Sequence, residues 1–553
     1  MKNIKYIFVV GGVISGVGKG ITTSSLGLIL KNRGFKVSAV KIDPYINVDA
    51  GTMNPIEHGE VFVLDDGDET DQDMGNYERF LDINLTKLNY MTTGRVYKTV
   101  IEKERNLEYQ GKCVQVVPHI PLEVIKRIQK VGKDSKADIV IIEIGGTVGE
   151  YENILFLEAA RMMKIKSPRD ICFVMVSYLP TPSKVGEMKT KPTQHAVRAL
   201  NTCGIQPDIL IARANTELDE KRKEKLSLFC NMFQDRVISA PDVESIYDIP
   251  SFFEKEKISE KICKILNLSN KKINTASWNQ WENFVKKSHN SKKEIKIAII
   301  GKYFETGDFI LSDSYLSIIE AIKYSSYAQD VKPVISWLNS VDFENNSTQS
   351  KKKLNDLKKY DGILVPGGFG SRGVEGKLKC IEFVRKNKIP YFGLCYGMQM
   401  MIIEYAQNVL KLKDVNTREI NPDAKNIVID VMEDQKEFLK NKSYGGSMRL
   451  GSYKAILKDN TIAQQAYGTK EIMERHRHRY EVNPDFIEDL EAKGLIFSGI
   501  SPNGKLMEIV ELPKDKHPFF LGTQFHPEFL ARPLKPHPLF NFFIKACIKV
   551  SKV

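Results

Sequence analysis

The sequence predicts an α/β protein with two doubly wound domains, each built on a mostly parallel sheet. Apolar runs rich in β-branched residues recur in the first half of the chain, at 6–10, 36–40, 137–146, 170–178 and 208–213. Similar runs recur in the second half, at 296–301, 361–368, 389–395 and 519–528. Helix-like stretches separate these runs, and strands that alternate with helices are typical of parallel sheets with helices on both faces.

A polar segment divides the two series of strands. Residues 268–294 are rich in lysine, asparagine and serine and contain one short amphipathic stretch, which is typical of a linker. We therefore expect a first domain at 1–267 and a second at 295–553. The chain of 553 residues is too long for one ordinary core, which agrees with this division.

The composition favours a globular protein that binds small anions. The chain is 42% hydrophobic and 27% charged, with a formal net charge of +12. Its basic residues are spread along the sequence and form no arm or stripe, so we expect nucleotides and not nucleic acid as partners. The 8 cysteines form no CxxC pair, and no apolar run is long enough to span a membrane. We therefore expect a cytoplasmic protein without zinc or disulfides.

A glycine-rich turn follows the first apolar run. Residues 11–20, GGVISGVGKG, lead into a predicted helix that ends near Gly34. Glycines let backbone amides approach a polyphosphate, and Lys19 can reach the outer phosphates, which predicts an ATP site. Gly12 lies one residue too early for a P-loop and Gly20 replaces the usual Ser or Thr, so a simple strand-to-helix turn is the alternative.

Charged residues elsewhere in the first half support a nucleotide site. Glu143 ends a run that is otherwise apolar, and because a buried unpaired glutamate is costly, it is a candidate magnesium ligand. Several acidic residues at 64–75 are further candidates. Lys189 and Lys191 precede Pro192 at the start of a predicted helix and could neutralise a second polyphosphate, although a capped surface helix is the alternative.

A cysteine, a histidine and a glutamate in the second half form a candidate triad. Cys395 has a G-x-C-x-G setting between a predicted strand and helix, the arrangement of a nucleophile elbow. His526 and Glu528 would face the same side of a strand. These residue types support acyl transfer through a thioester, and the glycine-rich segment 363–373 could supply oxyanion-hole amides.

Motifs in both halves resemble those of known families. GLCYGMQ at 393–399, with FHPE at 525–528, is similar to class I glutamine amidotransferases. The segments 11–20, 41–63, 69–80, 143–153, 189–195 and 475–483 are together similar to the CTP synthase family. The resemblance covers nearly the whole chain. It implies a P-loop-like amidoligase domain and a glutamine amidotransferase domain that convert UTP to CTP with ATP and with ammonia from glutamine, through a 4-phosphorylated UTP and a glutamyl thioester.

The resemblance also implies residue roles. Cys395 would attack glutamine, with His526 and Glu528 completing the triad. Glutamine would be bound by Gly368, Tyr396, Gly397, Met398, Gln399, Glu419 and Arg479, with Gly368 also holding the oxyanion. ATP would be bound by Gly16, Val17, Gly18, Lys19, Gly20, Ile21, Asp73, Asp242 and Val243, and Mg²⁺ by Asp73 and Glu143. UTP or the inhibitory product CTP would be bound by Ser15, Glu150, Tyr151, Glu152, Lys189, Thr190, Lys191, Pro192, Thr193, Gln194 and Lys225.

Further features follow from the resemblance alone. An ammonia channel would have its gate at Pro55, His58 and Val61. GTP as allosteric activator would act near Arg372 and Glu375, CTP would be a feedback inhibitor, and the protein would be a homotetramer. The chain departs from the family pattern at Tyr396, where relatives often have leucine, and at 150–152, where EYE replaces the commoner DIE.

Two other functions compete with this interpretation. One is an ATP-dependent carboxylate amidotransferase of the cobyrinic acid amidase type, for which the motif KTKPTQ at 189–194 has no evident purpose. The other is a nucleotide-sensing scaffold without activity, which the presence of Lys19, Cys395, His526 and Glu528 disfavours.

Overall fold

The chain folds into two compact units. The computed structural model describes residues 3–184, 186–269, 271–302, 305–306, 309–310, 312–432, 435, 440 and 445–551. Unit 1 consists of Met1–Ala50 and Asp73–Val285, and unit 2 of Gly51–Gln72 and Lys286–Val553. Residues 51–72 therefore belong to the second unit, whereas the sequence analysis assigned them to the first domain. Within the described residues, none of the helices has both the length and the apolar character needed to cross a bilayer.

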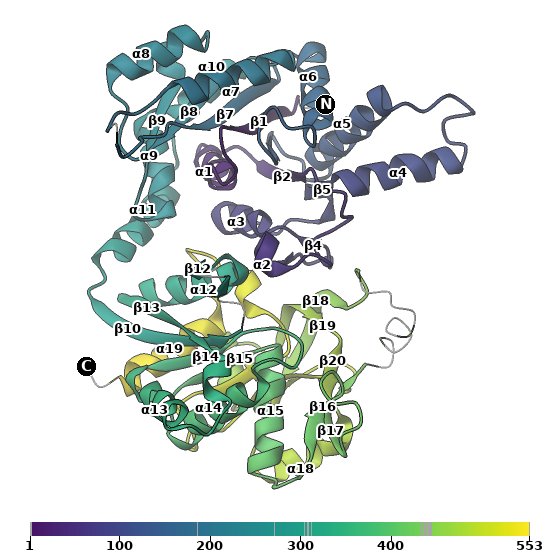
Figure 1. The fold of residues 1–553 in the computed structure, drawn as a ribbon, viewed down its shortest axis with the longest axis vertical. Coiled ribbons are helices and arrows are strands. Elements are labelled where there is room, and N and C mark those ends of the chain that lie inside the picture. Colours follow the sequence, from purple (N-terminus) through teal and green to yellow (C-terminus); the bar gives the residue numbers. More distant parts are fainter. Residues whose placement is uncertain are drawn as a thin grey trace. The chain divides into compact units, whose positions relative to one another are not determined.

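Unit 1 is built on a seven-stranded, entirely parallel sheet (Figure 1). In spatial order its strands are β5 (Tyr90–Thr92), β2 (Val37–Asp43), β6 (Ile139–Ile144), β1 (Lys5–Gly12), β7 (Ile171–Tyr178), β8 (Ile209–Ala214) and β9 (Val237–Pro241). The expected strands in this half are confirmed. β5 and β9 were not expected, because neither is a long apolar run in the sequence.

Helices cover both faces of the unit 1 sheet. On one face lie α5 (Val116–Asp134), α6 (Ile154–Lys166) and α7 (Lys191–Thr202), and on the other α1 (Lys19–Asn32) and α9 (Ile249–Lys255). The remaining helices of this unit are α3 (Gln72–Leu81), α4 (Thr93–Arg105), α8 (Glu220–Phe229), α10 (Ile258–Ile265) and α11 (Thr275–Asn290). Alternate strand residues such as Phe8, Ile142 and Phe173 are completely buried beneath the first group.

The predicted linker contains a regular helix. Most of 268–294 is α11, whose Trp281 is buried and donates a hydrogen bond to the carbonyl oxygen of Tyr247 at 3.1 Å. The amphipathic stretch expected in the linker therefore packs on unit 1 through Trp281 and Phe284. Asn270, within the predicted linker, lies outside the described residues.

Unit 2 is built on a nine-stranded mixed sheet. Its parallel part, in spatial order, is β13 (Val331–Asn339), β10 (Lys293–Gly301), β14 (Gly362–Val365), β15 (Tyr391–Leu394) and β23 (Phe520–Thr523). Its antiparallel continuation is β22 (Met507–Glu511), β21 (Ile496–Ile500), β18 (Arg449–Leu457) and β19 (Glu471–His478). The expected strands of this half all lie in the parallel part, but the run 519–528 is a strand only as far as Thr523. His526 and Glu528 are therefore not on a strand, because His526 caps the short helix Pro527–Leu530 that contains Glu528. The antiparallel strands contain polar residues or glycine among their apolar residues, so they are not continuous apolar runs and were not predicted.

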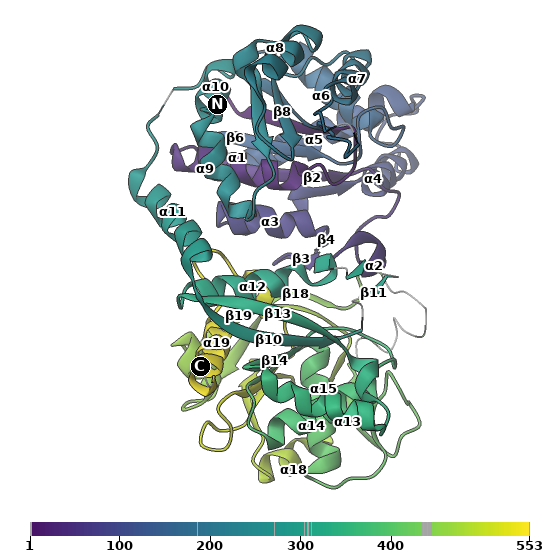
Figure 2. The ribbon, with the colours of Figure 1, turned by 60° about the vertical axis from the view of Figure 1, so that its left-hand side comes forward.

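Helices also cover both faces of the unit 2 sheet (Figure 2). One face carries α14 (Val374–Lys386) and α15 (Tyr396–Asn408), and the other α12 (Leu316–Tyr327) and α19 (Pro538–Val550). Smaller helices are α2 (Pro55–His58), α13 (Thr348–Asp356), α17 (Ile462–Tyr467) and α18 (Ile487–Ala492). The short strands are β3 (Phe62–Val63), β4 (Glu69–Thr70), β11 (Glu305–Thr306), β12 (Phe309–Ile310), β16 (Val415–Thr417), β17 (Asn426–Val431) and β20 (Tyr480–Val482).

Charged contacts hold residues 51–72 in unit 2. Arg475 is fully buried and donates to Asp65 Oδ1 at 2.6 Å and to the Val63 carbonyl oxygen at 3.1 Å. Arg477, two residues further along β19, donates to Glu69 Oε1 at 2.8 Å. These arginines are alternate residues of one strand, so both face the β3–β4 hairpin.

Candidate active sites

Cys395 lies at a sharp turn between β15 and α15. Its backbone has φ 48° and ψ −98°, a strained conformation for a residue with a side chain. The neighbouring glycines permit the turn: a Cβ on Gly397 would lie 2.2 Å from the Val365 carbonyl oxygen, and one on Gly393 would lie 2.7 Å from Tyr391 Oη. The nucleophile elbow expected from the sequence is therefore present, with the thiol at the N-terminus of a helix.

His526 and Glu528 form a hydrogen-bonded pair close to this turn. His526 Nδ1 lies 2.7 Å from Glu528 Oε1, and the imidazole stacks on the Phe529 ring at 5.1 Å between centroids. His526 Nε2 is buried and has no hydrogen-bond partner among the described residues. The ring is thus held in place through Nδ1, and Nε2 remains available for a proton from Cys395.

The carboxylate of Glu528 controls the charge of His526. Burial alone would lower the pKa of His526, but Glu528 and the Cys395 sulfur outweigh burial and raise this pKa to about 10. The imidazole is therefore protonated at neutral pH. A histidine that is cationic beside a cysteine favours a thiolate–imidazolium pair.

Replacing Glu528 by glutamine should move the alkaline limit of glutaminase activity to lower pH. The imidazolium is present below the pKa of His526 and is lost as the pH rises through it, so wild-type turnover should persist to roughly pH 9. Without the Glu528 charge, burial dominates and the pKa of His526 falls. The measurement is glutamate release between about pH 6 and 11 for both proteins. Superimposable alkaline limbs would contradict this role of Glu528.

Amides after β14 face the same space as Cys395. Gly367 and Gly368 both line the cavity at Cys395, and a Cβ on Gly367 would lie 2.9 Å from His526 Cε1. A Cβ on Gly368 would meet nothing within 4 Å, so its backbone borders open space. The role of Gly368 in an oxyanion hole stays a prediction, and the close packing at Gly367 explains why a glycine stands there.

The residues predicted to bind glutamine divide into two groups. Tyr396 and Glu419 meet at one peptide, because Tyr396 Oη donates to the Gly370 carbonyl oxygen at 2.7 Å and the Gly370 amide donates to Glu419 Oε1 at 2.7 Å. Met398 and Gln399 are buried, as is Tyr396. The Gln399 side chain donates to the Tyr480 carbonyl oxygen and to Gln524 Oε1, as described below.

Arg479, the last of the residues predicted to bind glutamine, directly follows β19. It donates to Gln435 Oε1 at 3.0 Å and to Ser447 Oγ at 2.9 Å. A guanidinium is the side chain best suited to bind a carboxylate, so Arg479 has the chemistry that its predicted role needs.

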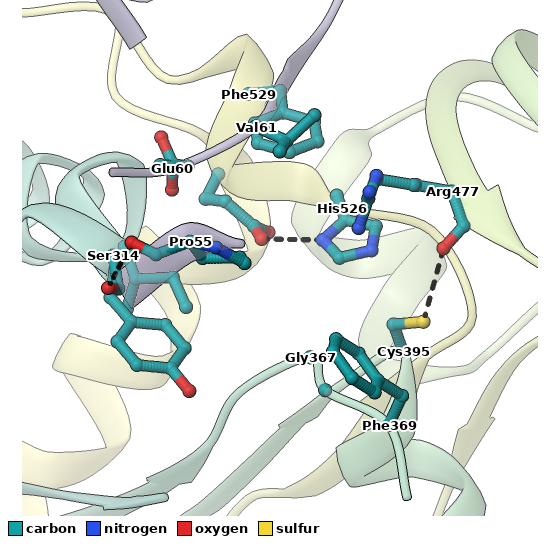
Figure 3. A pocket seen from close by; sticks show the side chains of 14 residues that line it. Pro55, Glu60, Val61, Ser314, Gly367, Phe369, Cys395, Arg477, His526 and Phe529 are labelled. Carbon is teal, nitrogen blue, oxygen red and sulfur yellow. Dashed lines mark hydrogen bonds and ion pairs between the residues drawn. The ribbon is translucent and has the colours of Figure 1, made fainter. Parts of the chain in front are cut away.

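A cavity of about 100 Å³ extends from the cysteine to residues 55–61. Figure 3 shows Cys395, His526 and Gly367 around one end and Pro55, Glu60 and Ser314 around the other. Of the expected gate residues, Pro55 and Val61 line this cavity. His58 is not among its lining residues, and its Nδ1 lies 3.5 Å from Asp71 Oδ2.

Glu60 was not expected to matter and helps to shape this cavity. Its carboxylate accepts hydrogen bonds from the Ser317 amide, at 3.1 Å to each oxygen, and from the Ser317 hydroxyl. The Glu60 amide donates to the Asp313 carbonyl oxygen at 3.0 Å. A glutamate next to an apolar run is the sequence signal for such a buried carboxylate.

In unit 1 the glycine-rich loop joins β1 to α1. Gly16 and Gly18 have φ of 68° and 92°, values that favour glycine. Lys19 is buried and donates to the Gly146 carbonyl oxygen at 3.0 Å. Burial lowers the pKa of Lys19, although Glu143 opposes the shift, so a polyphosphate at this site would stabilise its charge.

The packing around Gly20 explains why glycine stands where the P-loop pattern has Ser or Thr. A Cβ on Gly20 would lie 2.0 Å from Asp73 Oδ1 and 2.6 Å from Asp73 Cγ. The carboxylate of Asp73 thus occupies the space in which a P-loop serine or threonine would place its side chain. Glycine is needed here because α3 brings Asp73 against the start of α1.

The two predicted magnesium ligands meet at a lysine. Lys41 Nζ lies 3.2 Å from Glu143 Oε1, 3.4 Å from Asp43 Oδ1 and 2.5 Å from Asp73 Oδ2, and Tyr77 donates to Glu143 Oε2. The described residues hold no group of three or more histidine, cysteine, aspartate or glutamate side chains placed for a metal ion. Mg²⁺ needs only one or two carboxylates when phosphates supply other ligands, so Asp73 and Glu143 fit it.

Lys41 and Tyr77 were missed from the sequence. Lys41 follows directly on the apolar run 36–40, which is the same signal that identified Glu143. Tyr77 lies within the motif 69–80, but nothing in its spacing distinguished it from a core tyrosine.

Arg213, which was not predicted from the sequence, links Asp242 to the glycine-rich loop. Arg213 donates to Asp242 Oδ1 at 2.6 Å, and its Nη1 lies 2.8 Å from the position of a Cβ on Gly18. Val243, next to the exposed Asp242, is half-buried. Arg213 ends the apolar run 208–213, where a charged residue carries the same signal as Glu143.

The residues predicted to bind UTP or CTP lie at the N-terminus of α7 and in loops, except Lys225, which lies in α8. Thr193 is buried and its hydroxyl bonds to Ser177 Oγ at 2.8 Å, whereas Lys189 is paired with Glu187 at 2.6 Å. The same Glu187 has its pKa lowered by Lys189 and, more weakly, by Lys225, so these cations share one region. Tyr151, with 92% of its surface exposed, forms no part of a closed pocket within the chain.

Other members of this set lie as follows. Glu150 accepts from the Thr147 amide at 2.7 Å, and Gln194 Nε2 donates to Thr190 Oγ1 at 3.1 Å. The exposed or half-buried members of the UTP/CTP set are Ser15, Glu152, Lys191 and Pro192. In the predicted ATP set, Val17 and Ile21 flank the glycines and Lys19.

Comparison with known proteins gives one consistent family. Residues 5–268 match the family model "CTP synthase N-terminus" and residues 310–546 the model "Glutamine amidotransferase class-I". The CTP synthase of Thermococcus gammatolerans is 49% identical over 544 residues, which are 98% of this chain and 98% of that protein. The chain belongs to the CTP synthase family. The CTP synthase of Sulfolobus acidocaldarius is likewise 49% identical, over 98% of this chain and 99% of that protein.

A solved structure gives a partial match. The Trypanosoma brucei CTPS glutaminase domain with bound acivicin is 34% identical, with a TM-score of 0.42, over 47% of this chain and 96% of that one. As a member of the CTP synthase family, the chain is a glutamine-hydrolysing ligase that aminates UTP. The full-length match decides against the carboxylate acceptor of the cobyrinic acid amidase alternative.

Proposed function

We propose that Cys395, His526 and Glu528 release ammonia from glutamine in unit 2, and that the Lys19 loop in unit 1 uses ATP to activate UTP for that ammonia. The observation that carries this proposal is the Cys395 elbow beside a histidine whose Nε2 has no partner among the described residues. The test is the absorbance change on CTP formation from UTP and ATP, with either glutamine or an ammonium salt as nitrogen source.

The proposed glutaminase half-reaction assigns one role to each of these residues. The Cys395 thiolate attacks the side-chain amide carbon of glutamine, and the amides at Gly368 hold the resulting oxyanion. His526 gives its proton to the amide nitrogen, the C–N bond breaks, and ammonia leaves a glutamyl thioester. His526 then takes a proton from water, which attacks the thioester and releases glutamate and the Cys395 sulfur.

The synthase half-reaction depends on positioning and charge. Loop amides and Lys19 orient the ATP γ-phosphate toward the 4-oxygen of UTP, which attacks phosphorus and displaces ADP while the N3 proton of uracil is lost to solvent. Ammonia then attacks carbon 4, phosphate leaves with that oxygen, and the nitrogen loses a proton to give CTP. Asp73 and Glu143 would hold Mg²⁺, which supplies neutralisation of the triphosphate charge.

Val61 provides a test of the ammonia route. It is buried and lines the Cys395 cavity, so tryptophan at this position should fill the space between the cysteine and Pro55. We expect Val61→Trp to hydrolyse glutamine but to lose about tenfold or more of its glutamine-dependent CTP formation, while ammonium still supports CTP formation. Glutamate and CTP are measured in the same reaction. A retained one-to-one ratio of the two products would contradict the assignment of this cavity to the route.

Regulation and assembly belong to the same proposal. The α4–α5 segment exposes a series of apolar side chains, namely Ile101, Leu107, Val116, Val117 and Leu122. This exposed surface supports a homotetramer in which subunit contacts bury the segment. GTP activates near Arg372 and Glu375, and CTP inhibits at the UTP residues. In sequence, the synthase domain is 1–267, the linker 268–294 and the amidotransferase domain 295–553. The 8 free cysteines support a cytoplasmic location.

A further inference from the structure

Gln524 is a fully buried residue beside the nucleophile. Its side-chain amide has no role in the Cys395–His526–Glu528 triad. It follows directly on β23, as Cys395 follows directly on β15, and these strands are parallel neighbours in which Leu394 is paired with Thr523. The carboxyl ends of the two strands therefore place the two residues side by side. Gln524 has 0% of its surface exposed, and its Nε2 donates to Cys395 Sγ at 3.6 Å.

The hydrogen bonds of a second glutamine decide which way the Gln524 amide points. Gln399 Nε2 lies 3.2 Å from the Tyr480 carbonyl oxygen, which only accepts hydrogen bonds, so the Gln399 nitrogen must face it. The same nitrogen lies 3.3 Å from Gln524 Oε1. The oxygen of Gln524 is thereby turned toward Gln399, and its NH₂ group toward the sulfur.

The sulfur is thus bordered by a donor as well as by the histidine. The Gln524 amide donates from one position, and His526 Nε2, buried without a partner among the described residues, can take the thiol proton from another. Hydrogen bonds to a charged acceptor are stronger than those to a neutral one, so the Gln524 donor stabilises the thiolate more than the thiol. Proton transfer from Cys395 to His526 is favoured accordingly.

We propose that Gln524 is a catalytic residue that stabilises the Cys395 thiolate by hydrogen bonding, and that Gln399 is the positioning residue that orients its amide. This inference deepens the proposed function and rests on Cys395 being the nucleophile. It also assigns the Gln399 side chain to Gln524 and not to the substrate.

The test is the rate at which iodoacetamide alkylates Cys395 as a function of pH, followed by peptide mass spectrometry to separate it from the other cysteines. Gln524→Met keeps the side-chain length and removes the donor. We expect its alkylation rate at pH 7 to fall about tenfold, with the midpoint of the pH profile moved to higher pH. Gln399→Met keeps the Gln524 donor but removes the hydrogen bond that orients the Gln524 amide. We therefore expect a smaller fall in the alkylation rate and a smaller shift of the midpoint.

A matched control is Gln329→Met. Gln329 lies just beyond α12 in the same unit, does not line the Cys395 cavity, and its amide donates to the carbonyl oxygens of Ser325 and Asn541 at 3.2 and 3.1 Å. Its alkylation profile should match the wild type. Ammonium-dependent CTP formation and the melting temperature report whether each variant is folded.

The possible outcomes distinguish the role of Gln524 from the proposed formation of CTP. A wild-type alkylation profile in folded Gln524→Met would overturn the role of Gln524, even if glutaminase turnover falls through altered packing. Alkylation requires neither glutamine nor UTP, so it reads the Gln524 contact whether or not the proposed reaction is correct. Failure of the proposed function would instead appear as CTP formation from neither nitrogen source in the wild type.

Discussion

Replacing Cys395 by alanine should abolish CTP formation with glutamine and leave CTP formation with ammonium close to the wild-type rate. Without the sulfur no thioester forms, so glutaminase turnover should fall by at least about a thousandfold. The synthase residues belong to unit 1, whereas Cys395 belongs to unit 2, so the substitution removes only the supply of ammonia. The absorbance assay with each nitrogen source measures both effects in one preparation.

An exposed cysteine offers the matched control. Cys113 lies in unit 1, and Cys113→Ala should use both nitrogen sources as the wild type does. Equal loss of both activities in folded Cys395→Ala would show that the cysteine has a structural or shared role. Undiminished use of glutamine would remove Cys395 from the mechanism altogether.

Replacing Gly20 by alanine should have the opposite pattern, with CTP formation lost from both nitrogen sources and glutaminase activity retained. The added Cβ would lie 2.0 Å from Asp73 Oδ1, closer than two non-bonded atoms can approach. Either Asp73 must leave its contact with Lys41, or α1 must shift and carry Lys19 with it. Both displacements disturb the residues that orient ATP, so we expect a loss of about a hundredfold or more.

Ser24 supplies a control on the same helix. Its hydroxyl donates to the Gly20 carbonyl oxygen at 2.8 Å, and Ser24→Ala removes that bond without adding an atom near Asp73. This variant should keep most of its activity. Gly20→Ala with wild-type CTP formation would mean that the Asp73 carboxylate does not need its present position. Loss of glutaminase activity as well would point to misfolding, and the melting temperature would show it.

Features carried by local sequence could be predicted, and the structure confirms the fold class they indicated. Buried parallel strands are continuous apolar runs, so β1, β6 and β7 were predicted. The antiparallel strands β18, β19 and β21 are interrupted by polar residues or glycine and were not. The elbow at Cys395 was predicted because its glycines and nucleophile are consecutive in the chain. The phosphate loop was predicted for the same reason.

Other parts of the sites depend on residues that meet only in space. The pairing of Lys41 with Asp73, and of Arg477 with Glu69, joins segments that no local pattern connects. The membership of 51–72 in unit 2 likewise follows from salt bridges to β19, not from any property of that segment alone.

The sequence by itself determined the two α/β domains, the triad residue types and the glycine loop, because strand periodicity and turn chemistry act between neighbours in the chain. Only the tertiary structure decided why position 20 must be glycine, which way the Gln524 amide points, and that the cavity at Cys395 reaches Val61. The physical reason is that steric exclusion, hydrogen-bond direction and cavity shape depend on atoms brought together by folding, whose separation along the chain carries no information about their distance.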